Sequence, residues 1–246
     1  MGWWERSDPV FPSGARRPAI GLVAPTTAPG ASVSERPGLL RAKLASSGTS
    51  RPKFAGVSDG QPGLLARVSG WETRSSREVY ANAWIRVLED ETVRPDGSDG
   101  LFGVVEVRQP AVFVVAVTDA DEIVLVTIDR YTTGAGVEVP AGSSDEGEAP
   151  EATARRELRE ETGYTAERLT LLGRHWANNG VARAQVVVFL ARGLSMGTPE
   201  GQEAEGITGA VAYPWPDVRR MLRDGTITDS ESVGALMLAA LELGWA

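Results

Sequence analysis

The sequence predicts an α/β domain of layered strands and helices, and three observations lead to that prediction. Two continuous apolar runs, 111–118 and 184–191, are typical of central strands that are buried on both faces. Between them lies segment 150–162, which contains no helix breaker after its first residue and is predicted to be a helix. Further helical segments follow the last predicted strand. Strands, one helix, more strands and then helices indicate an α/β layered domain.

The first 69 residues differ in composition from the rest of the 246-residue chain. Pro, Gly, Ser, Ala and Thr recur there without a helical or strand period. We therefore expect residues 1–69 to be a low-complexity, largely disordered extension and residues 70–246 to be the folded domain. Trp3 and Trp4 are unusual in such a segment, and either form a docking element for a partner or belong to an incidental upstream sequence.

Charge and residue usage exclude several classes of function. The net charge is −8, yet residues 1–68 carry nine basic and four acidic residues, which leaves 16 basic and 29 acidic residues in 69–246. Such an acidic body argues against a nucleic-acid-binding surface. The absence of cysteine excludes disulfides and thiolate metal sites and fits a reducing compartment. Without a ~20-residue apolar span or a secretory signal, we expect a cytoplasmic protein with no membrane partner.

The strands before the helix are expected in sequence order. Segment 79–93 has the β-branched and aromatic content of strands, and Pro95-Asp96-Gly97 is a turn signal. Strand 101–107 follows. The turn at 119–121 should let 123–128 pair back on 111–118 as a hairpin.

After the helix we expect two further strands, a loop, a third strand and two helices. The strands are 169–176, 184–191 and 207–213, the glycine-rich acidic loop is 193–206, and Pro216 opens a helix that Asp224-Gly225 closes. Ser230 is the expected cap of the last helix. Its apolar stripe predicts core packing, with a partner interface as the alternative; it comprises Val233, Leu236, Met237, Ala240 and Leu241.

The helix at 150–162 carries the most informative spacing. Glu157, Glu160 and Glu161 stand at i, i+3 and i+4, so their carboxylates share one face. Three like charges on one stripe weaken a helix unless something positive compensates them, and hard divalent cations such as Mg²⁺ or Mn²⁺ prefer oxygen ligands. The alternative is a solvated acidic helix, paired with Arg155, Arg156 and Arg159.

The residues around this helix resemble a known motif. Gly142, Glu148 and the run Arg156-Glu157-Leu158-x-Glu160-Glu161-x-Gly163-Tyr164 resemble the Nudix box, G-x5-E-x7-R-E-U-x-E-E-x-G-U, in which U is a bulky aliphatic residue. All seven fixed letters match, and Tyr164 replaces the last aliphatic residue. The resemblance implies a Nudix-type mixed β-sheet sandwiched between helices, and hydrolysis of a nucleoside diphosphate linked to another group.

The resemblance also implies roles for the motif residues. Glu157 and Glu161 would be the chief ligands of Mg²⁺ or Mn²⁺, with Glu160 assisting and the backbone carbonyl at Ala141 also binding metal. Arg156 would steer Glu157. It would also hold the loop on the helix through an ion pair with the remaining acidic residue of the motif, Glu148.

Beyond the box, residues 70 to 246 are similar to the ADP-ribose pyrophosphatase group. In that group a late-loop glutamate activates water or binds metal, which points to Glu203 or Glu205 within the acidic stretch 200–205. Arg130 and Glu138 are candidates for substrate contacts, or else form a structural salt bridge. His175, the single histidine, is expected to be structural, with a catalytic base as the alternative.

The expected activity is therefore Mg²⁺-dependent hydrolysis of ADP-ribose to AMP and ribose 5-phosphate by a homodimer. Val137 stands where the group usually has an aromatic residue, and 177–180 lacks the group's proline, so a nucleotide-sugar substrate stays open. A Nudix module that senses a nucleotide without hydrolysing it is the alternative from another class. An RNA-end-processing enzyme would need a basic channel, which the acidic body does not favour.

Overall fold

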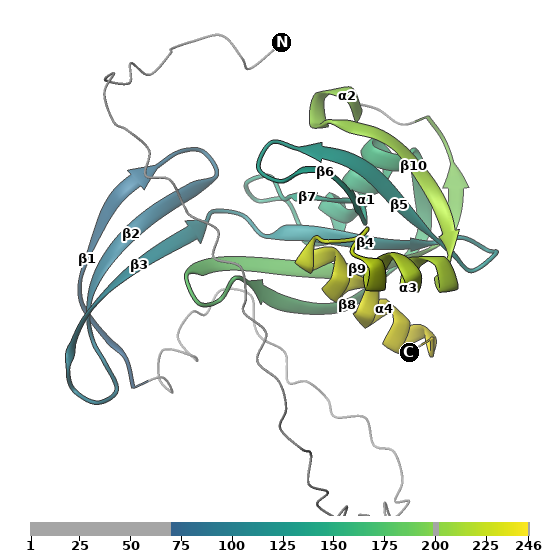
Figure 1. The fold of residues 1–246 in the computed structure, drawn as a ribbon. Helices are drawn as coiled ribbons and strands as arrows, with labels where there is room; N and C mark the ends of the chain where they lie inside the picture. The colour runs from purple at the N-terminus through teal and green to yellow at the C-terminus, as the bar shows by residue number, and fades with distance from the viewer. Residues whose placement is uncertain (1–69, 199–201, 246) are drawn as a thin grey trace, which may run out of the picture. The chain divides into compact units, whose positions relative to one another are not determined.

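The fold is described from a computed structural model that describes residues 70–198 and 202–245 (Figure 1). These residues all fall within one compact unit, Val57–Ala246. The predicted extension, 1–69, lies outside the described residues, as do 199–201.

Strands dominate the described chain, and helices follow at three places. The strands are β1 (Glu72–Ala81), β2 (Ile85–Val93), β3 (Asp99–Val107), β4 (Ala111–Val117), β5 (Glu122–Arg130), β6 (Gly134–Glu138), β7 (Ala141–Ser143), β8 (Tyr164–Ala177), β9 (Ala182–Met196) and β10 (Ile207–Pro214). The helices are α1 (Pro150–Thr162), α2 (Gln202–Glu205), α3 (Trp215–Asp224) and α4 (Ser230–Leu243). None of the helices in the described ranges combines the length and apolarity that crossing a membrane requires.

The strands form one mixed sheet in the order β1-β2-β3-β9-β4-β5-β10. Neighbouring strands at both ends of this order are antiparallel, whereas β9 is parallel to β3 on one side and to β4 on the other. Three strands branch off this path, because β6 pairs with β5, β7 with β4 and β8 with β9. The predicted mixed sheet is confirmed.

Two apolar cores lie on opposite faces of β4, as the period of two in a strand requires. On one face Val112 and Val114 belong to a buried cluster with Leu158 of α1. On the other face Val115 belongs to a larger cluster with Leu236 of α4. Both leucine side chains are fully buried, and each such burial contributes about 2 kcal/mol. The central sheet therefore lies between helices, as expected for the fold class (Figure 1).

The last helix differs from its prediction in two details. Its cap is Asp229, whose carboxylate accepts a hydrogen bond from the Ser232 backbone N–H at 2.7 Å, so the assignment of Ser230 was wrong. Asp caps a helix as well as Ser does, and here it stands one residue earlier. Within the predicted stripe only Leu236 and Ala240 are buried. The exposed members are Val233, Met237 and Leu241, since the helix turns small side chains such as Ala235 and Ala239 toward the sheet.

Two predicted loops contain regular structure. In the first, Gly142 and Ser143 continue β7, which pairs with β4 through Ala141↔Phe113 and Val112↔Gly142. In the second, 193–206, β9 continues to Met196 opposite Tyr164 of β8, and α2 forms near the end. Both predictions relied on local composition, whereas pairing with a neighbouring strand overrides weak local preference.

Candidate active site

Helix α1 holds its acidic residues toward the interior because its apolar stripe is fixed on the sheet. The helix begins with Pro150 in its first turn and ends at Gly163, whose φ of 77° is the left-handed conformation that favours glycine. Ala154 and Leu158 are fully buried in the cluster with β4 and β9. The neighbouring face buries Glu157 and Glu161, which retain only 3% and 2% of their exposure. The predicted helix is confirmed in both its start and its end.

Gly142 is required by close approach of the Glu157 carboxylate. A Cβ atom at this position would stand 1.9 Å from Glu157 Oε1 and 2.2 Å from its Cδ. No side chain fits that space while Glu157 keeps its position. The glycine of the motif therefore lets β7 lie directly against the acidic face of α1.

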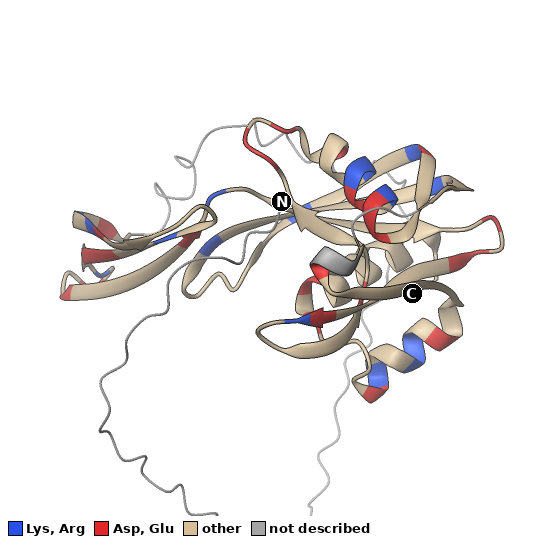
Figure 2. Ribbon diagram, turned by 90° about the horizontal axis from the view of Figure 1, so that it is seen from above, with Lys and Arg blue, Asp and Glu red and all other residues tan. Residues whose placement is uncertain are grey.

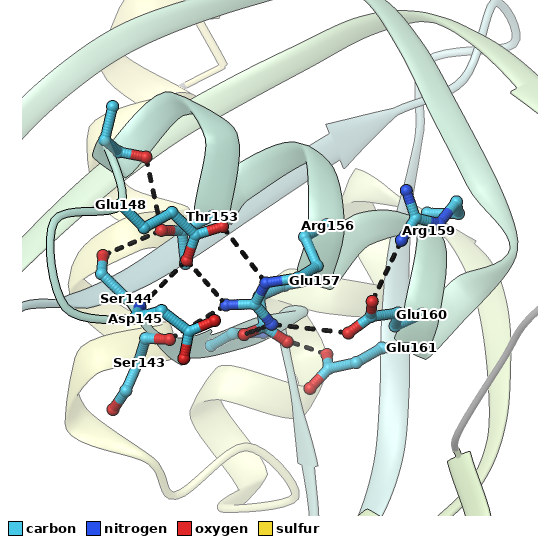
Figure 3. Close-up of polar contacts among 12 residues, drawn as sticks. Ser143, Ser144, Asp145, Glu148, Thr153, Arg156, Glu157, Arg159, Glu160 and Glu161 are labelled. Atoms are coloured by element: carbon cyan, nitrogen blue, oxygen red, sulfur yellow. Dashed lines mark hydrogen bonds and ion pairs between the residues drawn. The ribbon is translucent and has the colours of Figure 1, made fainter. Parts of the chain in front are cut away.

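Arg156 connects the loop before α1 to the acidic face (Figure 3). Its guanidinium donates to both carboxylate oxygens of Glu148, at 3.2 and 3.0 Å, and to the Ser143 carbonyl at 3.1 Å. The same group donates to Glu157 at 2.7 Å and, at 3.4 Å, to Glu160. The ion pair expected between Glu148 and Arg156 is thus present, and it is bidentate, which fixes the orientation of both groups.

The acidic residues differ sharply in proton affinity. The Arg156 hydrogen bonds hold the pKa of Glu148 at about 2. Burial raises the pKa of Glu157 to about 6, opposed by the positive charge of Arg156. Burial likewise raises the pKa of Glu161 to about 8, although the Ala141 N–H donates to this carboxylate at 3.0 Å. A proton or a cation is therefore favoured where Glu157 and Glu161 meet.

Three carboxylates converge at this place. Oxygen atoms of Glu157, Glu161 and Glu205 all lie within 4.8 Å of one another, and Glu205 is the exposed member. An all-oxygen donor set of this kind suits Mg²⁺ or Mn²⁺. Glu160 points elsewhere, since Arg156 and Arg159 take its carboxylate at 3.4 and 3.0 Å. Ala141 adjoins the cluster through its N–H bond to Glu161.

The late acidic segment contributes one described carboxylate. Glu205 is the last residue of α2 and reaches the cluster. Glu203 lies in the same helical turn, but its side chain is outside the described residues, as is Glu200 altogether. Of the two predicted alternatives, the structure thus places Glu205 beside the acidic face of α1.

The carboxylates stand at the wall of a cavity of about 900 Å³. Residues of the predicted site line one part of it, and these include Arg130, Ala141, Gly142, Arg156, Glu157 and Glu205. The opposite part is formed by β2, β3 and the segment after β3. The residues from that part are Ala83, Trp84, Arg86, Glu106, Val107, Arg108 and Gln109.

The second wall was missed in the sequence, where these residues read only as strands. Trp84 is 68% exposed although it is a large apolar residue, and it lines the cavity together with Arg86 and Arg108. Arg86 is paired with Glu106 at 2.7 Å across β2 and β3, and this partner raises the pKa of Arg86. A tryptophan followed by alternating charged residues was the available signal, but it does not reveal which cavity the residues share.

Arg130 and Glu138, the two predicted substrate contacts, pair with each other across β5 and β6. Arg130 Nη2 lies 2.7 Å from Glu138 Oε2, and Glu138 is buried with 7% exposure. The Glu138 hydrogen bond raises the pKa of Arg130, and its guanidinium still lines the cavity. His175 lies on β8 away from this cavity, where its ring faces Gly234 of α4.

Fold and site together define an α/β protein whose sheet-packed helix presents buried carboxylates to a polar cavity. Residues 107–233 match the NUDIX domain, and residues 71–105 match the nucleoside diphosphate sugar hydrolase N-terminal domain. The chain belongs to the Nudix family and is a Nudix hydrolase.

Relatives with named activities share much of the chain. It is 34% identical over 180 residues to an ADP-ribose pyrophosphatase of Mycobacterium tuberculosis (strain ATCC 25618 / H37Rv), covering 72% of this chain and 86% of the relative. It is 37% identical over 126 residues to an ADP-ribose pyrophosphatase of Bacillus subtilis (strain 168), covering 51% and 68%. Among solved structures, an ADP compounds hydrolase superposes with a TM-score of 0.63 at 22% identity, covering 72% of this chain and 97% of that one. This last likeness supports the fold.

Proposed function

We propose that the protein hydrolyses the pyrophosphate bond of ADP-ribose to AMP and ribose 5-phosphate, with Mg²⁺ or Mn²⁺ as cofactor. The observation that carries this proposal is the convergence of Glu157, Glu161 and Glu205 within 4.8 Å, with Glu157 and Glu205 at the wall of the cavity. Similarity to two ADP-ribose pyrophosphatases supports the choice of substrate.

The chemistry assigns each acidic residue a different task. Glu157 and Glu161, with the Ala141 backbone, would hold the cation, and Glu160 would assist from the ion pairs it makes with Arg156 and Arg159. A bound divalent cation neutralises the anionic pyrophosphate and lowers the pKa of a coordinated water. Arg156 positions Glu157 through their contact at 2.7 Å.

Glu205 is the carboxylate placed to take a proton from the attacking water, because it is the exposed member of the cluster and lines the cavity. The water oxygen forms a bond to one phosphorus while the bond from that phosphorus to the bridging oxygen breaks. The proton goes to the carboxylate, and the bridging oxygen leaves with the other phosphate.

The remaining cavity residues suit the two ends of such a substrate. The exposed Trp84 ring offers a flat surface on which a nucleobase stacks, and Arg108 and Arg130 offer planar donors for phosphate oxygens. Glu138 would act on the substrate through Arg130, whose guanidinium it holds at 2.7 Å.

A nucleotide sugar is the second candidate substrate. The match of residues 71–105 to a nucleoside diphosphate sugar hydrolase N-terminal domain favours it, since β2 and β3 of this segment line the cavity with Arg86. The phosphate chemistry is the same for both substrates, so the non-phosphate half decides between them.

The test is a panel of ADP-ribose, nucleotide sugars and dinucleoside diphosphates, incubated with purified protein and Mg²⁺ or with EDTA. We expect AMP from ADP-ribose with Mg²⁺ and none with EDTA. Preferential turnover of a nucleotide sugar would move the proposal to the second substrate. Binding of a nucleotide with no product across the panel would replace hydrolysis by a sensing function.

We further propose a cytoplasmic homodimer. The dimer is supported by β1, which lies at one end of the sheet order with every residue exposed, next to exposed Trp71 and Tyr80. Such an edge strand offers unpaired backbone groups to a second chain. Sedimentation that shows monomers alone at micromolar concentration would contradict it. The lack of cysteine supports a reducing compartment.

A further inference from the structure

The C-terminal end of α1 receives a side chain from a distant part of the sequence. The last carbonyls of an α-helix have no donor within the helix. The side-chain amide of Gln202 donates to one of them, the Glu161 carbonyl, across 41 residues of sequence. Nearby, the Gly197 N–H donates to the Gly163 carbonyl at 2.7 Å. On the other flank of α2, the Asp129 N–H donates to the Gly206 carbonyl at 2.9 Å.

Gln202 and Glu205 are the first and last residues of α2, three apart on one helical turn. Side chains at i and i+3 lie on the same face, so both are directed to the same neighbour. Gln202 contacts the backbone of Glu161, and Glu205 brings its carboxylate to those of Glu157 and Glu161. Glu161 is consequently held at two points, its carboxylate by the Ala141 N–H and its carbonyl by Gln202.

We propose that Gln202 is a positioning residue whose amide docks α2 on α1 and thereby sets where the Glu205 carboxylate stands. The inference rests on the proposed function, in which Glu205 completes the cation site. A neutral amide suits the task, because it satisfies the helix-end carbonyl without neutralising the nearby carboxylates, as a Lys or Arg would. Gln202 acts through Glu205 and need not touch the substrate.

The first test measures cation binding without substrate. Gln202→Met keeps the length and the helix preference of the side chain but removes the donor. We expect about tenfold weaker Mn²⁺ binding to the metal-free protein, measured from the electron paramagnetic resonance signal of free Mn²⁺. We also expect kcat to fall about tenfold while KM changes less than about twofold. The matched control is Gln185→Met, a half-buried glutamine on β9 that does not line the cavity.

The second test is a double-mutant cycle with Glu205→Gln. If Gln202 acts through Glu205, adding Gln202→Met to Glu205→Gln leaves Mn²⁺ affinity and kcat unchanged from Glu205→Gln alone. Effects that multiply in the double variant would overturn the proposal, as would normal Mn²⁺ binding by Gln202→Met. Should Gln202→Met fail to fold, Gln202→Asn repeats the cycle with an amide one methylene shorter.

The two proposals fail in different ways. Wild-type protein that binds Mn²⁺ but hydrolyses no member of the panel contradicts the proposed function and leaves the Mn²⁺ cycle intact as a test of Gln202. Wild-type protein that hydrolyses ADP-ribose, while Gln202→Met matches it in both Mn²⁺ affinity and kcat, overturns the Gln202 inference alone.

Discussion

The region formed by α1 and β7 and the region formed by β1, β2 and β3 use the same residues in opposite ways. Both pair Arg with Glu or Asp, and Figure 2 shows acidic residues beside basic ones on helices and strands alike. In the first region the Arg156–Glu148 pair leaves only 25% and 17% of the two side chains exposed. In the second, the Arg77–Glu89 pair leaves 69% and 41% exposed at the same kind of distance.

The difference shows that burial decides what an ion pair does. Exposed pairs gain little, because water and salt screen them and two long side chains must be ordered. Buried pairs constrain position strongly, since removal of one partner leaves an uncompensated charge. The acidic face of α1 therefore needs Arg156, Gly142 and, as proposed, a cation, whereas the charges of β1 and β2 are individually dispensable.

The largest expected effect comes from the most buried acid. Glu161→Gln should lower kcat by about three orders of magnitude, which corresponds to about 4 kcal/mol of transition-state stabilisation, because it removes a cation ligand. The amide keeps the shape of the side chain, so the circular dichroism spectrum and melting temperature of the metal-free protein should stay normal or rise. Near-normal turnover in this variant would remove the metal assignment.

The next effect tests close packing rather than charge. Gly142→Ala places a Cβ atom where the Glu157 carboxylate stands, so we expect kcat to fall about a hundredfold through displacement of that ligand. Gly103→Ala on β3 is the control, because nothing lies within 4 Å of its Cβ position, and its turnover should match wild type. Equal behaviour of the two variants would contradict the role of Gly142.

A third prediction concerns pH. Because the folded pKa of Glu161 is raised to about 8, the folded protein binds more protons than the unfolded chain between about pH 4.5 and 8. Without metal, stability should be full below this window and fall as pH rises through it, by roughly 5 °C in melting temperature. Glu161→Gln should flatten this slope, and saturating Mg²⁺ should oppose it. An unchanged slope in the variant would assign the effect elsewhere.

The smallest expected effect lies in the strand region. Arg77→Ala removes an exposed partner of Glu89, so we expect a change of less than about 0.5 kcal/mol in the free energy of unfolding and no change in kcat. Urea unfolding measures the first quantity. A loss above about 2 kcal/mol would show that this surface is covered, as it would be in a dimer.

The sequence predicts most closely those elements whose ends are chemically marked. Pro150 and Gly163 define α1 to the residue, and the alternating apolar runs place β4 and β5. Where two good caps stand side by side, as Asp229 and Ser230 do, spacing does not choose between them. Composition is weaker still, since β7 and the end of β9 exist through pairing with strands remote in sequence.

For the candidate site, the sequence predicts one side only. The local spacing on α1 brings out Glu157 and Glu161, because a helix fixes their separation. Which residue of the late acidic segment joins them depends on how α2 docks, and no local pattern records that contact between Gln202 and Glu161. Trp84 enters the same cavity through the order of strands in the sheet, which strand periodicity does not determine.

Strand β9 carries a consequence for any change in chain length. Its first residues align with β3 through Val105↔Ala182 and Glu106↔Arg183, and the next aligned stretch, beginning at Val186, runs along β4. The stretch between Arg183 and Val186 thus works as a ruler that sets the offset between the strand bearing Glu106 and the strand against which α1 rests. Deleting one residue there would invert the inward and outward sides of one half, so homologues that differ in length should accommodate the change elsewhere.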